Sequence, residues 1–217
     1  MKIMKMPSMG MFAVNCYMMV SDAGNAALID APCGGEAILR AIAESGAKLQ
    51  KILLTHGHCD HIESLTLIAE KTGAQVYIHS ADEAKLHDDY LNLSDYFAEY
   101  YDEPVTHYRG ANTVSDGDII TLDEVSFRVM HTPGHTSGSV CYLADEVMFS
   151  GDTLFKRSGG RTDIPDGDTA ALMKSLKMLD EMTEDYALLS GHGEASSLFE
   201  EKRNNPYMKG FGYDDMF

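Results

Sequence analysis

The chain has 217 residues, of which 44% are hydrophobic and 24% are charged, and its formal net charge is −17. This composition is typical of a globular protein with one substantial core, and the excess of carboxylates argues against a broad nucleic acid-binding surface. Pro7 and Gly10 interrupt the apolar N-terminal residues, so we expect neither a secretory signal nor a membrane span. The four cysteines form no CxxC pair, which favours a reducing, cytoplasmic location.

The first half of the chain alternates strands with helices after an opening hairpin. Asp22, Gly24 and Asn25 separate two short apolar runs, a pattern typical of a β-hairpin. Gly46 and Gly73 each follow a stretch with apolar residues at helical spacing, so we expect each to end a helix. The predicted elements are strands 17–20 and 26–29, a helix from 35, strand 51–55, a helix from about 63, and strand 75–78.

The second half repeats this outline. Asp123 and Glu124 join the strands of another predicted hairpin, and a long helical pattern begins after Asp168. No linker or low-complexity segment divides the chain, so we expect one domain over residues 1–217. Two such halves packed sheet to sheet, with helices outside, predict an α/β fold in the form of a four-layer αββα sandwich. The predicted elements are strands 118–122, 125–130, 139–143, 147–150 and 186–189, a helix after 168 and a helix over 197–202.

Two segments are rich in aromatic residues. Residues 80–103 repeat large apolar side chains at about helical spacing, which predicts a helix that packs its apolar stripe on the body of the protein. A lid or pocket wall near the predicted metal site and a dimer contact stay open as alternatives. The tail 206–217 is also aromatic, so we expect it to pack against the protein.

A dense cluster of metal-binding side chains follows the strand predicted at 51–55. Three histidines and one aspartate fall between His56 and His61, on a turn between a strand and a helix. Alternate side chains of an extended backbone point the same way, so the His-x-His step lets imidazoles converge. Imidazole nitrogens and a carboxylate suit a borderline divalent cation such as zinc.

Three more candidates stand at predicted strand ends, each beside glycine. Because the strands deliver them to one edge of the sheets, and small neighbours leave space around them, we expect them to join the first cluster. Together they supply enough ligands for two divalent metal ions, each with an open coordination position. The seven candidate ligands are His56, His58, Asp60, His61, His135, Asp152 and His192.

These motifs resemble those of the metallo-β-lactamase superfamily and, within it, of the hydroxyacylglutathione hydrolases (glyoxalase II). The family's His-x-His-x-Asp-His pattern runs from His56 to His61, and the resemblance covers nearly the whole chain. His61 stands where β-lactamases usually carry arginine or cysteine, which favours the hydrolase branches over antibiotic breakdown. The ending 205–207 is similar to that of a short, single-domain bacterial subgroup. From the length of the sequence we expect no C-terminal helical region of the kind that helps full-length glyoxalase II hold glutathione.

The resemblance implies a hydrolase with a dinuclear metal centre. A water between the two cations would lose a proton near neutral pH and attack a carbonyl carbon. A thioester suits this chemistry, because its leaving thiol has a pKa of roughly 8.5 and departs without an acid. Asp60 would also orient the water or accept its proton, which makes it the catalytic candidate. The implied ligands are His56, His58 and His135 for one cation, Asp60, His61 and His192 for the other, and Asp152 as the bridge.

Two cationic residues that follow Asp152 are predicted to bind substrate. Lys156 and Arg161 would anchor a substrate carboxylate, and Arg161 matches the Gly-Arg step of the family. The expected partner is therefore a small anionic thioester such as S-lactoylglutathione, with no nucleic acid and no membrane. A homodimer stays open.

Other readings of the same residues stay open. The run 151–155 is similar to both the glyoxalase II and the persulfide dioxygenase branches, and a dioxygenase would need a single iron. A lactonase or phosphodiesterase would use the same two cations, and a non-catalytic binding module would keep an unused site. We expect zinc, with iron or manganese as alternatives, because histidine and carboxylate sites accept all three.

Overall fold

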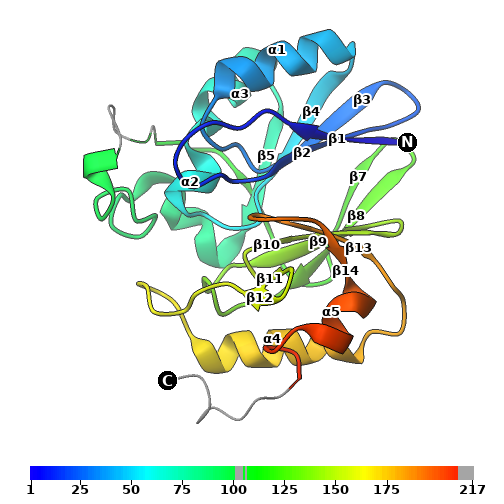
Figure 1. Cartoon of the computed structure of the whole chain (residues 1–217). Helices are drawn as coiled ribbons and strands as arrows, with labels where there is room; N and C mark the ends of the chain where they lie inside the picture. The colour runs from blue at the N-terminus through cyan, green and yellow to red at the C-terminus, as the bar shows by residue number, and fades with distance from the viewer. Residues whose placement is uncertain (101–104, 106, 210–217) are drawn as a thin grey trace.

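The computed structural model describes residues 1–100, 105 and 107–209. In this part of the chain, two six-stranded sheets are stacked, and helices cover the outer face of each (Figure 1). The predicted four-layer αββα sandwich is therefore confirmed. No helix of the described residues is long and apolar enough to cross a membrane.

The first sheet contains the N-terminal strands in their chain order. The strand β2 pairs antiparallel with both β1 and β3, whereas β3, β4, β5 and β6 run parallel to one another. Parallel strands deliver their C-terminal ends to the same edge of a sheet, which is where their following loops meet. The strands are β1 (Lys2–Met6), β2 (Cys16–Val20), β3 (Asn25–Ile29), β4 (Lys48–Leu53), β5 (Gln75–His79) and β6 (Asn112–Val114).

The second sheet is built from the C-terminal half. It is antiparallel except for the neighbouring strands β10 and β13, and a separate two-stranded ribbon follows β10. In sheet order the strands are β14 (Ser196–Ser197), β13 (Ala187–Ser190), β10 (Val147–Gly151), β9 (Val140–Ala144), β8 (Val125–His131) and β7 (Ile119–Leu122), and the ribbon is β11 (Leu154–Phe155) with β12 (Ser158–Gly159).

Helices α1 and α3 lie on the first sheet, and α4 and α5 lie on the second (Figure 1). The left-handed Gly46 ends α1, and the carboxylate of Asp168 begins α4 by accepting a hydrogen bond from the backbone N–H of Ala171. Both boundaries agree with the sequence prediction. The helices are α1 (Gly35–Ser45), α2 (Cys59–Ile62), α3 (Leu65–Thr72), α4 (Thr169–Glu181) and α5 (Leu198–Asn204).

Three apolar layers hold these elements together. Successive side chains of a strand point to opposite faces, so β2 sends Met18 toward α1 and α3 but Met19 toward the second sheet. Phe127 and Phe149 fill the space between the sheets, and Leu176 of α4 packs on the second sheet's outer face. This burial fixes both sheets, and with them the loops at their shared edge.

The segment predicted as a helix over 80–103 is not one regular helix, so that prediction is wrong. It begins with a 3-10 helix, η1 (Ser80–His87), continues in turns, and has a short 3-10 turn, η2 (Ala98–Tyr100). The side chains of Asp88 and Asn92 accept hydrogen bonds from nearby backbone N–H groups, which competes with helical bonding. Residues 101–103 lie outside the described residues.

The structure describes only the first part of the aromatic tail, residues 206–209. Tyr207 packs against the core between the second sheet and its helices, as expected. The other aromatic residues of the tail, at 211, 213 and 217, lie outside the described residues.

Candidate metal centre

The structure brings all seven predicted ligands together at one edge of the two sheets. His56 and His58 lie in the loop after β4, and Asp60 and His61 belong to α2. The remaining three come from the second sheet, in the loops after β8, β10 and β13: His135, Asp152 and His192. The edge is therefore the place where strand ends of both halves meet, which is how residues remote in sequence share one site.

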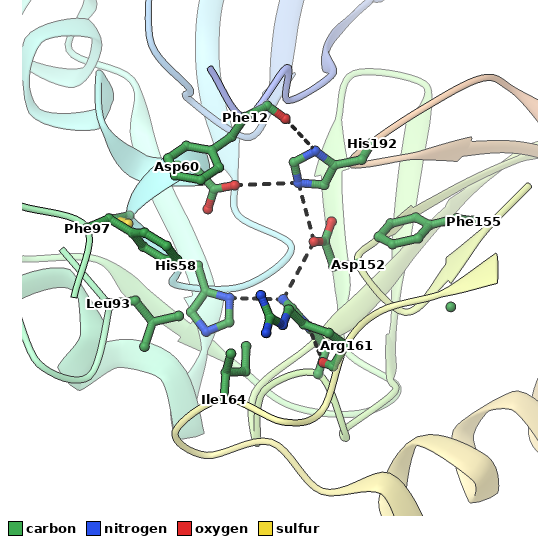
Figure 2. A pocket seen from close by; sticks show the side chains of 13 residues that line it. Phe12, His58, Asp60, Leu93, Phe97, Asp152, Phe155, Arg161, Ile164 and His192 are labelled. Atoms are coloured by element: carbon green, nitrogen blue, oxygen red, sulfur yellow. Dashed lines mark hydrogen bonds and ion pairs between the residues drawn. The ribbon is translucent and has the colours of Figure 1, made fainter. Parts of the chain in front are cut away.

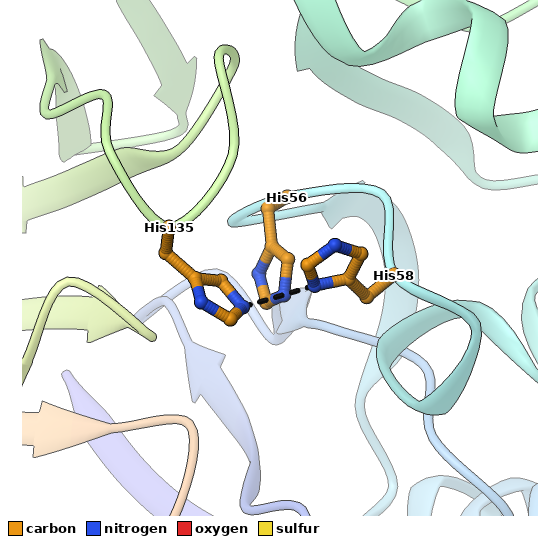
Figure 3. A group of neighbouring side chains, drawn as sticks. All are labelled: His56, His58 and His135. Carbon is orange, nitrogen blue, oxygen red and sulfur yellow. Dashed lines mark hydrogen bonds between the residues drawn. The ribbon is translucent and has the colours of Figure 1, made fainter. Parts of the chain in front are cut away.

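Three histidines form the first group of ligands (Figure 3). Nδ1 of His58 lies 2.9 Å from Nε2 of His135, and the ring of His56 lies 4.8 Å and 4.9 Å from their two rings, centroid to centroid. All three side chains are buried. Their nitrogens converge as the ligands of a single cation do.

A second group consists of Asp60, His61 and His192. Nε2 of His192 lies 3.4 Å from Oδ2 of Asp60 and 3.4 Å from Nε2 of His61. This group is more open than the first, because the side chains of His192 and Asp60 are 26% and 18% exposed. A substrate therefore has access to this side of the cluster.

Asp152 stands between the two groups. Its Oδ1 lies 3.4 Å from Nε2 of His61, and its Oδ2 lies 3.4 Å from Nε2 of His192. The same Oδ2 is 3.6 Å from Nε2 of His135, in the first group. One carboxylate thus reaches both groups, as the implied bridging role requires.

The cluster contains buried polar atoms that the described residues leave without a hydrogen bond. These are Nε2 of His56, Nε2 of His58 and Oδ1 of Asp152. Leaving such an atom buried and unpaired costs about 1–3 kcal/mol. Cations bound by imidazole and carboxylate would compensate this cost, so the donor set fits a dinuclear metal site.

Backbone carbonyl groups orient two of the histidines. Nδ1 of His135 donates to the carbonyl of Arg161, and Nδ1 of His192 donates to the carbonyl of Phe12, each at 2.8 Å. Since a carbonyl only accepts, the proton must be on Nδ1, and Nε2 is left to face the cluster. Both rings are thus fixed in the tautomer that binds a cation through Nε2.

Asp30 is a functional residue that the sequence prediction missed. It directly follows β3, is 1% exposed and has a left-handed backbone, with a φ of 60°. Its carboxylate lies 2.9 Å from Nδ1 of His61 and accepts hydrogen bonds from the backbone and hydroxyl of Thr55. Its position could have identified it from the sequence, because Asp30, like Asp152, is an aspartate at the end of a predicted buried strand.

Asp82 is the second missed residue. It is fully buried and accepts hydrogen bonds from the backbone N–H of Gly57 and of Gly138, each at 2.9 Å. It also pairs with Lys85 at 2.9 Å. Because Gly57 separates the first two ligands and Gly138 follows His135 in its loop, Asp82 joins the two loops that carry the first group.

Burial and neighbouring charges set the protonation of the cluster. Burial, with the neighbouring imidazoles, lowers the pKa of His56 and of His58 well below the usual range, so both imidazoles are neutral. Burial opposes charge on His61 and His192, but nearby carboxylates outweigh it. They raise the pKa of His61 well above its usual value and that of His192 to about 9. Burial also opposes the charge of Asp152, yet the imidazoles hold its carboxyl pKa well below the usual range.

A cavity of about 320 Å³ lies over the open side of the cluster. Figure 2 shows Phe97 and Leu93 on one side of the ligands and Phe155 on the other. Arg161 lines this cavity, whereas Lys156 does not belong to its lining. The two predicted substrate-binding residues are therefore placed differently, and their role in binding stays a prediction.

Comparisons with known proteins agree with this architecture. The sequence profile of the Metallo-beta-lactamase superfamily matches residues 9–192. The chain belongs to the metallo-β-lactamase superfamily. Among its relatives, the chain is 32% identical to the hydroxyacylglutathione hydrolase GloC of Haemophilus influenzae, over 91% of this chain and 93% of GloC. The predicted resemblance to this superfamily is thus confirmed, and GloC supports the glyoxalase II-like branch.

Two solved structures of the superfamily share the fold. BLEG-1, described as a B3 metallo-β-lactamase, superposes with a TM-score of 0.89 and 31% identity, covering 96% of this chain and 100% of BLEG-1. TTHA1623, solved in a di-iron-bound form, has a TM-score of 0.81 and 30% identity, covering 93% of this chain and 98% of its own. The first neighbour is named a β-lactamase, so the preference drawn from His61 stays a prediction. The second shows that this fold also accepts iron.

Proposed function

We propose that this metallo-hydrolase cleaves thioesters at a dinuclear metal centre. The observation that carries the proposal is the presence of two complete ligand groups joined by Asp152, at the floor of a cavity that a small molecule can enter. The similarity to GloC supports thioesters as the substrate class. Hydrolysis of a lactoyl thioester is therefore the first activity to test.

His56, His58 and His135 would hold one cation, Asp60, His61 and His192 the other, and Asp152 would contact both. When bound, such cations supply a nucleophile at neutral pH by lowering the pKa of water, and they polarise a carbonyl oxygen. Zinc is the first expectation, with iron or manganese as alternatives, since this donor set accepts all three.

The residues of the chain contribute orientation and proton transfer. The carboxylate of Asp60 is partly exposed and lines the cavity, which supports its proposed role of holding or accepting a proton of the attacking water. The departing thiolate needs no proton donor, since a thiol has a pKa of roughly 8.5. This agrees with a cavity whose ionisable lining residues, within the described chain, are five of the predicted ligands, Cys59 and Arg161.

The second group of ligands distinguishes this proposal from its alternative. A mononuclear-iron persulfide dioxygenase would need only the ligands His56, His135 and Asp152, and would leave the others unused. In this chain Asp60, His61 and His192 form a complete second group, and Asp30 orients one of its histidines. Because these polar side chains are buried or partly buried together, their presence favours a centre that binds two cations.

The decisive experiment is metal analysis of anaerobically purified protein, followed by hydrolysis assays. We expect two cations per chain and turnover of S-lactoylglutathione or of S-lactoyl-N-acetylcysteamine. His58→Ala should lose both the full metal content and the turnover. His87→Ala is the matched control, because His87 lies on η1 outside the cluster. Two bound cations without hydrolysis of either thioester would refute the proposal.

One bound iron with oxygen uptake on a persulfide would select the dioxygenase, and turnover of a β-lactam or a phosphodiester alone would select another hydrolase.

A further inference from the structure

We propose that the cavity selects thioesters whose groups on either side of the scissile bond are apolar and uncharged. This inference rests on the proposed thioester hydrolysis and concerns the substrate class of the same site. It differs from the anionic substrate expected from Lys156 and Arg161, because the structure pairs both of these cations with carboxylates.

The walls of the cavity are apolar and come from four separate segments. Phe12 belongs to the loop between β1 and β2, Leu93 and Phe97 follow η1, Phe155 ends β11, and Ile164 precedes α4. The ring of Phe12 packs edge-on against Phe97 at 5.1 Å, centroid to centroid, and Phe155 lies 5.9 Å from the ring of His192. A substrate at the cluster therefore contacts hydrocarbon on both sides (Figure 2).

These walls are tied to the metal-binding loops. The carbonyl of Phe12 orients His192, and the carbonyl of Asn92 accepts a 2.8 Å hydrogen bond from the backbone N–H of Cys59, between two ligands. Asn92 is itself fully buried and donates to the carbonyl of Lys85. The apolar surface is thus held in place next to the cluster, as in pockets that are formed before the ligand arrives.

The cations around the cavity are already neutralised. Arg161 makes a two-pronged ion pair with Asp163, with N–O distances of 2.8 Å and 2.9 Å. Nζ of Lys156 lies 2.6 Å from a carboxylate oxygen of Glu194. Arg157, the neighbour of Lys156, pairs with a glutamate of α5 at 2.8 Å. A carboxylate on the substrate would have to compete with each of these partners.

The residues outside the described ranges supply no further cation. These residues, 101–104, 106 and 210–217, contain acidic, aromatic and small residues and one methionine, but no lysine, arginine or histidine. None of these residues could therefore add a positive charge near the cavity. On the thiol side of the substrate, glutathione would bring two carboxylates to this cavity. On the acyl side, an aromatic or branched group requires only apolar contact, which the cavity offers.

Matched substrates test the inference one group at a time. In the first pair, a lactoyl group is carried by glutathione or by N-acetylcysteamine, so the acyl group is constant while the carrier changes from an anionic tripeptide to a small uncharged thiol. In the second pair, N-acetylcysteamine carries a phenylacetyl or an acetyl group. We expect kcat/KM to be at least as high for the uncharged carrier, and about tenfold higher for phenylacetyl than for acetyl, the usual size of such discrimination in apolar pockets.

Two variants link these preferences to the proposed residues. Phe97→Ala should reduce the phenylacetyl-to-acetyl ratio, and Tyr90→Ala is its control, since Tyr90 is 66% exposed on the same segment. Asp163→Asn releases Arg161, so it should raise the glutathione-to-N-acetylcysteamine ratio by about threefold, a size typical of one exposed ion pair. Glu181→Gln, which breaks an exposed ion pair on α4, should leave that ratio unchanged.

The outcomes separate this inference from the proposed function. If glutathione thioesters are hydrolysed much faster than uncharged ones, and the phenylacetyl-to-acetyl ratio is near one, the inference is overturned while the thioesterase proposal stands. If no thioester of either pair is hydrolysed by metal-loaded protein, both fail. A preference for the apolar acyl group that Phe97→Ala abolishes supports the inference.

Discussion

Nδ1 of His61 lies 2.9 Å from Oδ2 of Asp30, a carboxylate buried at the end of β3. The same carboxylate accepts a 2.8 Å hydrogen bond from the backbone N–H of Thr55, which precedes the first ligand. Asp30 therefore fixes both the ring of one predicted ligand and the start of the segment that carries four of them, in the loop after β4 and in α2. Its contribution to the site is made through position rather than through contact with substrate.

We predict that Asp30→Asn weakens binding of the second cation by about 10–100-fold, the usual cost of losing a partner that orients a ligand. The amide keeps the shape of the side chain but removes the negative charge that faces His61. Metal competition titrations, read as affinity for each of two cations, measure the effect. Asp22→Asn removes the same charge from an exposed carboxylate and should bind both cations as the parent does.

Gly191 leaves room for the bridging carboxylate. A Cβ at this position would lie 2.3 Å from Oδ1 of Asp152 and 2.7 Å from Cε1 of His61. Gly191→Ala is therefore expected to displace both side chains and to lower the number of bound cations. Gly193→Ala is the control, because a Cβ there meets open space although its φ of 78° is strained for alanine. It should lose about 1 kcal/mol of stability and keep its metal. Equal metal content in both variants would contradict the prediction.

The buried pair of Asp82 and Lys85 is predicted to stabilise the fold around the first ligand group. Asp82→Asn leaves the buried ammonium of Lys85 with Asp166 as its remaining carboxylate partner, and should cost about 3 kcal/mol in urea unfolding. In the double variant Asp82→Asn with Lys85→Met, the loss should be smaller than the sum of the single losses, since no buried cation remains. Additive losses would show that the two residues act independently.

The raised pKa of His192 predicts how metal-free protein responds to pH. In the folded state its pKa is about 9, above the ordinary value of 6.5. Since the folded pKa is the higher one, the stabilisation is fully present below pH 6.5 and is lost as the pH rises through about 9. Chelator-treated protein should therefore lose stability between these values, and His192→Gln should lose less over the same range. The measurement is urea unfolding at a series of pH values, and a parent and variant with the same slope would contradict it.

Much of the fold follows from local sequence patterns. The hairpins, α1 and α4 are marked by turn residues, apolar periodicity and helix caps, all of which act within a few residues of one another. The strands β1 and β6 were not predicted, because β1 is an edge strand and β6 has only three residues. The segment after η1 was predicted wrongly, because Asp88 and Asn92 bond to the backbone in place of a helix.

The sequence by itself determined which side chains could bind cations, since imidazoles and carboxylates are identified by residue type and clustered at predicted strand ends. Only the tertiary structure decided which atoms support them and what surrounds the open side. The partner of His192 is a carbonyl 180 positions away, and the cavity walls come from four separate segments. Such contacts depend on how the two sheets pack, and packing between remote segments leaves no local pattern in the chain.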